Sequence, residues 1–90
     1  MAQDNKKAKK HLFKLRRPGV KEVLVSGTFN NWTLKGIACR EKNGVWTAEV
    51  ELKPGKYEYK FLVDGIWETD SDAVRVGNIY GTDNSVLIIQ

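Results

Sequence analysis

This 90-residue sequence is poor in the features that would place it outside the reducing interior of a cell. A single cysteine, Cys39, excludes an internal disulfide framework and fits a reducing compartment. The first ten residues lack the apolar core of a signal peptide, and no apolar run approaches the length of a membrane-spanning helix. We therefore expect a cytoplasmic protein without a membrane partner.

Helical periodicity is also missing. No window of ten residues repeats its apolar positions with a helical period, and there is no internal repeat. Turn signals instead separate short apolar runs, at Pro18-Gly19, Asn43-Gly44, Pro54-Gly55 and Asp64-Gly65. About seven short strands spaced in this way predict an all-β antiparallel sandwich that forms one domain.

The turns also predict which residues lie opposite one another. If Pro54-Gly55 closes a hairpin, four apolar pairs share one face, namely Leu52 with Tyr57, Val50 with Tyr59, Ala48 with Phe61 and Trp46 with Val63. The Asn43-Gly44 turn then places Cys39 opposite Ala48 and Ile37 opposite Val50. We expect Cys39 to be a buried, unreactive thiol, because the only histidine, His11, is far away in the sequence.

The net charge of +4 comes largely from the start of the chain, where Lys6, Lys7, Lys9 and Lys10 precede the first apolar run. A basic arm can bind nucleic acid or an anionic surface, or it can be a solvated terminus. Because the rest of the chain is near neutral, we favour the solvated terminus and expect no nucleic-acid partner. The predicted organisation is a flexible tail at residues 1–10 and a domain at residues 11–90.

The three tryptophans lie in different patterns. Trp46 belongs to the alternating run from Val45 to Leu52 and is predicted to be buried, whereas Trp32 and Trp67 follow polar or turn residues and are predicted to be exposed. A two-residue Asp64-Gly65 turn pairs Leu62 with Trp67 and puts Lys60, Leu62 and Trp67 on one outward face. An indole beside an ammonium group suits the apolar face and hydroxyl rim of a sugar ring.

Four segments resemble one known family. The sequence from Val25 to Trp32, Val-Ser-Gly-Thr-Phe-Asn-Asn-Trp, is similar to the opening signature of carbohydrate-binding module family 48. Within that family, the resemblance is to the glycogen-binding domains of AMP-activated protein kinase β subunits. Three later segments match in order and at the right spacing: Leu52 through Phe61, Val63 through Trp67, and Gly81 through Val86. The resemblance covers about residues 11 to 90.

The resemblance implies an immunoglobulin-like sandwich that binds α-1,4-linked glucans such as glycogen, starch and maltooligosaccharides, without catalysis, cofactor or metal. Trp32 and Trp67 match the two stacking tryptophans. Lys60 and Asn84 match residues that hydrogen-bond sugar hydroxyls, and Thr82 matches a lesser contact. Tyr80 replaces an aliphatic residue, and this change either adds a stacking surface or blocks the groove. The seven expected binding residues are thus Trp32, Lys60, Leu62, Trp67, Tyr80, Thr82 and Asn84.

Catalysis and calcium binding fit the sequence less well than glucan binding. The four carboxylates between Asp64 and Asp72 contain the pair that a glycosidase needs, but the chain is too short for the usual enzyme barrel. Asp70 and Asp72 lack the later ligands of a calcium loop. From spacing alone, a structural packing role for Trp32 and Trp67 is as well supported as a ligand-binding role. The alternative function is a protein-interaction module that docks onto a kinase or an amylase-type catalytic partner.

Overall fold

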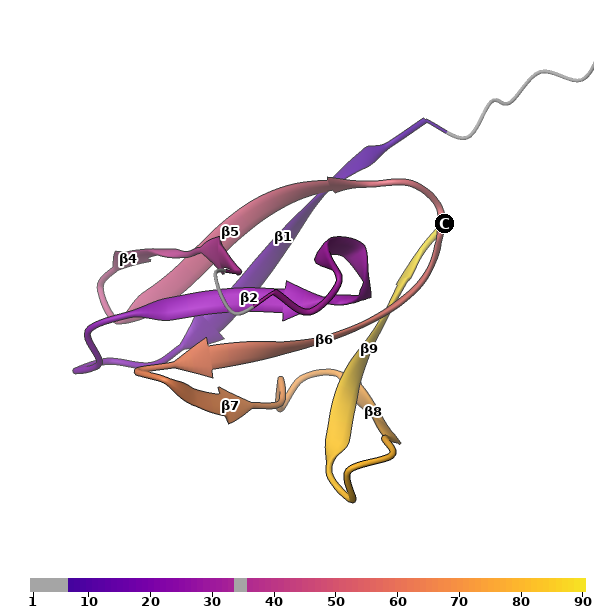
Figure 1. The fold of residues 1–90 in the computed structure, drawn as a ribbon. Coiled ribbons are helices and arrows are strands. Elements are labelled where there is room, and N and C mark those ends of the chain that lie inside the picture. Colours follow the sequence, from indigo (N-terminus) through magenta and orange to yellow (C-terminus); the bar gives the residue numbers. More distant parts are fainter. Residues whose placement is uncertain (1–6, 34–35) are drawn as a thin grey trace, which may run out of the picture.

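The computed structural model describes residues 7–33 and 36–90, which form strands joined by turns and a single 3₁₀ turn (Figure 1). The flexible tail predicted from the sequence falls mainly on residues 1–6, which lie outside the described residues. The elements are β1 (Lys9–Arg16), β2 (Val23–Gly27), η1 (Thr28–Asn30), β3 (Ile37–Ala38), β4 (Arg40–Lys42), β5 (Val45–Leu52), β6 (Gly55–Val63), β7 (Ile66–Glu68), β8 (Val74–Gly77) and β9 (Asp83–Ile89).

The strands make two antiparallel sheets that pack face to face as a sandwich. Sheet A has the order β1-β5-β4, and sheet B has the order β3-β2-β6-β9-β8 with β7 paired to β6. Figure 1 shows β4 and β5 above β2, β6 and β7, with β1 crossing the view diagonally and β8 and β9 lying to one side of β6. The predicted all-β antiparallel sandwich is confirmed, with nine strands among the described residues.

The core forms where the inner faces of the two sheets meet. Side chains alternate along each strand, so β1 turns Phe13 inward while its neighbours Leu12 and Lys14 remain exposed. Phe61 and Val25 of sheet B are fully buried opposite them. Burial of a side chain such as Phe13 contributes about 1.5–3 kcal/mol, so this layer of apolar contacts holds the sheets together.

Two of the predicted hairpins are present with the predicted geometry. Asn43-Gly44 joins β4 to β5, and Asp64-Gly65 joins β6 to β7. All four turn residues have positive φ, from 48° at Asp64 to 83° at Gly65, which is the conformation that a two-residue hairpin turn requires. Leu62 pairs with Trp67 and Val63 with Ile66, as the sequence predicts.

The third predicted hairpin, at Pro54-Gly55, is wrong. β5 pairs with β1 and β4, whereas β6 pairs with β2, β7 and β9, so the turn carries the chain from one sheet to the other. Because β5 and β6 each have a neighbouring strand along both edges, neither has an edge at which the other could pair. The turn residues are compatible with both outcomes, because they specify the reversal of the chain but not the pairing. Most of the residues predicted as neighbours, such as Trp46 and Val63, do face the core, but from opposite sheets.

The partner predicted for Ile37 is also wrong. Ile37 lies in β3 and pairs with Val25 of β2, because the chain changes sheets between β3 and β4. Cys39 sits at this crossing, where its backbone N–H donates to the carbonyl of Val23 at 2.9 Å. The thiol is buried as predicted. Burial raises its pKa to about 11, which keeps it protonated and unreactive near neutral pH.

The first strand begins two residues before residue 11, where the sequence predicts the start of the domain. β1 starts at Lys9, and Lys9 and Lys10 pair with Leu52 and Glu51. Two of the tail lysines are therefore part of sheet A. Within the described part of the chain, no helix is long and apolar enough to cross a bilayer.

Candidate functional site

A groove opens beside β6, β7 and β9 of sheet B and holds most of the residues that the sequence singled out. Its volume is about 1190 Å³, above the roughly 300–1,000 Å³ of small-molecule pockets, so it has room for several sugar units. Six of the seven predicted residues line it, namely Trp32, Lys60, Trp67, Tyr80, Thr82 and Asn84. Leu62 does not line it. Leu62 is half-buried and is paired with Trp67 in the neighbouring strand, where it can support the indole.

The two predicted stacking tryptophans meet at one end of the groove. The ring centroids of Trp32 and Trp67 are 6.3 Å apart, and the ring planes make an angle of 74°. Trp67 is 38% exposed, as predicted, but Trp32 is half-buried and is less exposed than the sequence suggested. Edge-to-face contact is a favourable arrangement of two aromatic rings. It also presents two apolar surfaces at an angle to a ligand.

Trp32 is held by a tightly bonded turn after β2. The side-chain oxygen of Asn30 accepts the backbone N–H of Gly27 at 2.9 Å, and the backbone N–H of Trp32 donates to the carbonyl of Gly27 at 2.9 Å. Asn31 and Trp32 both have a φ of 56°, which is unusual for residues with a β-carbon and uncommon above all for tryptophan. These bonds hold the backbone in that conformation.

Gly27 is required here because of close approach and not because of its φ angle. A β-carbon at Gly27 would lie 2.2 Å from the backbone oxygen of Glu58 and 2.9 Å from the side chain of Tyr59. Ser26 is fully buried under the turn, and its hydroxyl lies 2.9 Å from the carbonyl oxygen of Thr33. The hydrogen bonds and close packing of the segment from Ser26 to Trp32 therefore fix the position of the Trp32 indole.

Polar side chains on the floor of the groove form a connected network. Lys60 Nζ donates to Thr82 Oγ1 at 3.1 Å, and Asn78 Nδ2 donates to the same oxygen at 2.7 Å. Asn84, which is 9% exposed, donates from Nδ2 to Glu58 Oε1 and accepts from Asn78 at its Oδ1, both at 3.0 Å. Thr82 thus has both acceptor positions filled and keeps its proton, while Lys60 keeps two protons for a ligand.

Tyr80 projects from a turn that is locked by Asn78. Asn78 Oδ1 accepts the backbone N–H groups of Tyr80 and Thr82, at 2.9 and 3.2 Å, and its backbone N–H donates to the carbonyl of Thr82. Ile79 and Tyr80 are 90% and 83% exposed at the tip of this turn. An apolar pair held out into water by a fully bonded asparagine is a preformed contact surface.

The charges in the groove nearly cancel. Lys60 and Arg75 line it together with Glu58, Glu68 and Asp83. Several of these groups are already engaged within the protein, because Lys60 bonds Thr82, Glu58 bonds Asn84, and Glu68 pairs with Arg17. A channel for single-stranded nucleic acid would instead be uniformly basic. The balance suits a ligand that is polar and uncharged.

Asp64 and Asp70, two of the four carboxylates between Asp64 and Asp72, are engaged in hydrogen bonds within the protein. Asp64 accepts the backbone N–H groups of Lys21 and Glu22, at distances from 2.8 to 3.3 Å. Asp70 accepts the Tyr59 hydroxyl proton at 2.7 Å, and burial together with this bond raises the pKa of Tyr59. Each of these carboxylates fixes a turn or a strand end. No group of three or more metal-ligating side chains lies together in residues 7–33 and 36–90.

Eight of the residues that line the groove were not predicted from the sequence, and three of them carry polar or charged groups that bear on the site. Asn78 and Glu58 hold the floor together, and Arg75 lines the wall. Glu58 could have been found, because alternation places it on the same face of β6 as Lys60. Asn78 gave no such signal, since its side chain makes three bonds within a turn and a fourth to Asn84 of β9, and no short motif encodes this arrangement.

The chain matches known proteins over nearly its whole length. A family model described as the glycogen recognition site of AMP-activated protein kinase matches residues 10–90. The chain is 41% identical over 70 residues to Protein PTST homolog 2, chloroplastic, of Arabidopsis thaliana, covering 76% of this chain and 13% of that protein. It is 38% identical over 72 residues to the human 5'-AMP-activated protein kinase subunit beta-2, covering 80% of this chain and 26% of that protein.

One solved structure shares the fold at low sequence identity. The maltogenic amylase from S. marinus superposes with a TM-score of 0.69 and 21% identity, over 90% of this chain and 13% of that one. The chain thus spans between about an eighth and a quarter of the length of these three proteins. Its fold, its motifs and the match over residues 10–90 together show that the chain belongs to the family of AMP-activated protein kinase glycogen recognition domains.

Proposed function

We propose that this domain binds α-1,4-linked glucans, such as glycogen, starch and maltooligosaccharides, without catalysis. The observation that carries the proposal is the pair of indoles at 74° beside a polar floor. An α-1,4 chain curves, so successive glucose units can present their apolar faces to two surfaces set at an angle. A straight β-1,4 chain can stack on only one of the two, so we expect cellulose to bind poorly.

Hydrogen bonds from the floor complete the proposed contact. Lys60 and the hydroxyl of Thr82 have protons to offer to sugar oxygens, and the second oxygen of Glu58 can accept from sugar hydroxyls. Asn84 retains one amide proton and one lone pair, because its other positions bond Glu58 and Asn78. Asn84 therefore contributes through ordering the floor as well as through direct contact.

Tyr80 is proposed to add a third stacking surface instead of blocking the groove. Its ring is 83% exposed, and it lines the same groove as Trp32 and Trp67. The turn bonded by Asn78 holds the backbone of Tyr80 in place. Tyr80→Ala should then weaken glucan binding, whereas a blocking tyrosine would give tighter binding when removed.

Titration with β-cyclodextrin, followed by calorimetry, tests the ligand class directly. Affinity electrophoresis in gels containing amylopectin or glycogen extends the test to polymers, with hydroxyethyl cellulose as the control polymer. We expect retardation by the α-glucans alone, and little change between low and moderate salt because stacking and neutral hydrogen bonds carry the contact. Equal retardation by cellulose, or a loss of affinity by powers of ten with salt, would refute the proposal.

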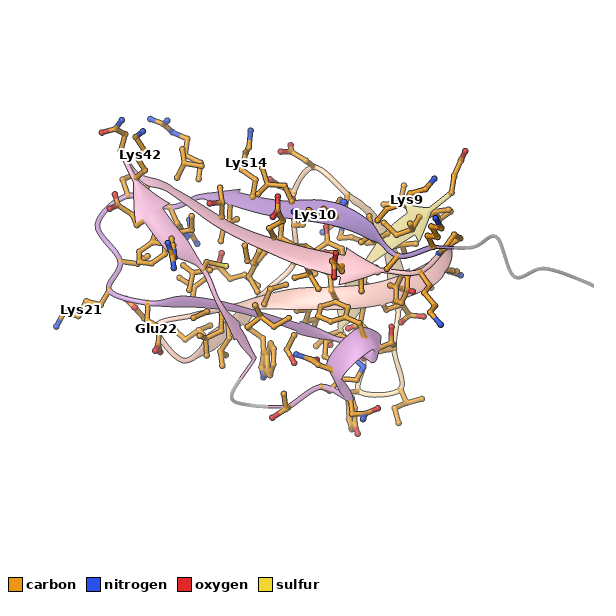
Figure 2. All side chains as sticks on the ribbon, turned by 90° about the horizontal axis from the view of Figure 1, so that it is seen from above. Lys9, Lys10, Lys14, Lys21, Glu22 and Lys42 are labelled. Carbon is orange, nitrogen blue, oxygen red and sulfur yellow. The ribbon has the colours of Figure 1, made fainter. Side chains whose placement is uncertain are left out.

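A second candidate function is docking onto a catalytic partner protein. The outer face of sheet A is exposed and basic at one end, where Lys14 and Arg16 of β1 flank β5 opposite Arg40 and Lys42 of β4. Figure 2, which looks onto this sheet, shows Lys10 and Lys14 along β1 and Lys42 on β4. Relatives named as a kinase subunit are much longer than this chain. Cytoplasmic location stays a prediction, and one relative is described as chloroplastic.

A further inference from the structure

The segment between β1 and β2 runs along the hairpin that carries Trp67. Residues 17–22 lead the chain from sheet A to sheet B, and they contact the β6–β7 hairpin at two separate points. One contact is at the turn of the hairpin and the other is at the far end of β7. Neither contact is part of a sheet ladder, so the segment acts as a brace from outside the sheet.

The first contact fixes the turn. The Asp64 carboxylate accepts the backbone N–H of Glu22 at 2.8 Å and that of Lys21 at 3.0 Å, and the Asp64 N–H donates back to the Glu22 carbonyl at 2.9 Å. Figure 2 shows the side chains of Lys21 and Glu22 directed away from the body of the protein. The backbone of the segment, and not its charges, therefore holds the turn.

The second contact fixes the end of β7. Arg17 Nη2 lies 2.5 Å from Glu68 Oε2, in an ion pair between residues that are 51 positions apart. The backbone of Arg17 is itself anchored, because its N–H donates to the Gly44 carbonyl at 2.8 Å and its carbonyl accepts the indole N–H of Trp46 at 2.9 Å. A continuous series of bonds thus runs from the buried Trp46 to the strand that carries Trp67.

The strand β7 has few restraints of its own. It contains three residues and, among the described strands, pairs only with β6. Ile66, on one side of Trp67, is 67% exposed and adds little packing. Glu68, on the other side, is the last residue of the strand, where fraying begins. After β7 the chain is next anchored at Asp70, whose N–H donates to Ser85 Oγ at 2.7 Å, so loss of the ion pair would loosen the residues between the Asp64 turn and this anchor.

We propose that Arg17 is a positioning residue for the groove, which it serves by holding β7 and hence the angle between Trp67 and Trp32. This inference rests on the proposed glucan function for its binding readout. Arg17 does not line the groove and so acts only through Glu68. Because both side chains of the pair are partly exposed, the pair contributes little to global stability and its effect is local.

The first test compares Arg17→Met with Arg16→Met. Arg16 is the neighbouring exposed arginine, and no ion pair joins it to a described residue, so it is a matched control for loss of charge. Losing the preorganised strand should raise the β-cyclodextrin dissociation constant of Arg17→Met about three- to tenfold. Its melting temperature should stay within about 2 °C of the parent protein. Equal affinities for Arg17→Met and the parent would overturn the proposal.

Rescue separates a positioning role from general damage. Arg17→Lys should keep most of the affinity, and Arg17→Glu combined with Glu68→Arg should bind better than Arg17→Glu alone. Raising NaCl from 0.05 to 1 M should weaken binding by the parent protein about two- to threefold through screening, and should leave Arg17→Met unchanged. The proposed brace would be contradicted if the charge-swapped double variant bound no better than Arg17→Glu and if salt weakened binding equally in Arg17→Met and the parent protein.

Hydrogen exchange tests the brace without any ligand. In Arg17→Met the amides of residues 66–68 should exchange faster than in the parent protein, whereas those in β5 and β6 should not change. If the parent protein fails to bind glucan, the proposed function is wrong, but unequal exchange in β7 still supports the brace. Unchanged exchange in β7 would overturn the brace even if glucan binding is confirmed.

Discussion

The two two-residue hairpins of this protein have the same local design and opposite outcomes. In both, a turn with two positive φ angles is followed by an apolar residue and then a tryptophan, as Gly44-Val45-Trp46 and Gly65-Ile66-Trp67. Trp46 pairs with Glu41 and is 8% exposed, whereas Trp67 pairs with Leu62 and is 38% exposed. The same position in the same kind of hairpin is buried in the core in one case and exposed beside the groove in the other.

The difference comes from what covers each hairpin. β5 runs on for eight residues between β1 and β4 and turns Trp46 toward sheet B, where Phe61 and Val63 also enter the core. β7 is short and lies beside β6 alone, and Trp67 faces away from sheet A. The local sequence therefore determines the turn and the register of each hairpin. The strands packed around the hairpin determine which of its faces is exposed to solvent.

The sharpest way to break this comparison is to remove the buried indole. Trp46→Ala should cost about 3–5 kcal/mol, a large part of the stability of so small a domain, because it empties a core position and leaves the Arg17 carbonyl without its donor. Chemical denaturation followed by circular dichroism measures the loss. A Trp46→Ala protein that melts near the parent temperature would invert the assignment of faces.

The matching change on the other hairpin should affect binding and not folding. Trp67→Ala, like Trp32→Ala, should leave a folded protein whose β-cyclodextrin affinity falls at least tenfold, or about 1.4 kcal/mol, as expected when an aromatic anchor is lost. Calorimetric titration and thermal melting on the same samples separate the two effects. Early melting of Trp67→Ala with retained affinity would show that this indole is structural.

Alkaline pH should lower the free energy of unfolding through Cys39, the buried residue that leads into β4. Burial raises the pKa of Cys39 from 9.0 to about 11, so the unfolded chain loses the thiol proton before the folded protein does. This stabilisation is complete below pH 9.0 and is lost as the pH rises to about 11, by roughly 1–3 kcal/mol. The unfolding free energy of Cys39→Ala should fall less across this range than that of the parent. Parallel pH profiles of the two proteins would contradict the assignment.

The smallest expected effect concerns the rim of the groove. Lys60→Ala removes a donor but no aromatic surface, so glucan binding should weaken by about 0.5–1.5 kcal/mol, less than for Trp67→Ala. Thr82 then loses one of its two donors while Asn78 still holds it. Calorimetry with maltoheptaose measures the difference. A loss equal to that of Trp67→Ala would shift the main contact from stacking to hydrogen bonding.

Much of the fold was predictable because its signals are local. Alternation placed Trp46 inward, and the Asp64-Gly65 turn gave the pairing of Leu62 with Trp67. The pairing of β5 with β1 was not predictable from Pro54-Gly55, because that turn permits a hairpin or a crossing and the choice depends on strands far away in the sequence.

The site, like the fold, has a part that local motifs predict and a part that depends on distant segments. Six predicted residues line the groove because their motifs fix short segments, as Gly27 and Asn30 do for Trp32. The supporting contacts of Asn78, Glu58 and Arg17 were missed. Alternation along β6 places Glu58 on the same face as Lys60, whereas the partners of Asn78 and Arg17 depend on how separate segments meet, which no spacing within one segment reveals.

The order in which the strands pair has a consequence for how the groove arises during folding. The β6–β7 hairpin joins neighbours in the sequence and can form in about 1–10 μs. The pairing of β1 with β5, and of β6 with β9, joins distant segments, and such topologies close on a timescale of roughly milliseconds to seconds. Thr82 and Asn84 reach Lys60 and Glu58 only when β9 has docked. A chain that lacks β9 would still contain both indoles but would lack the polar floor of the groove, so the groove is complete only after this late pairing.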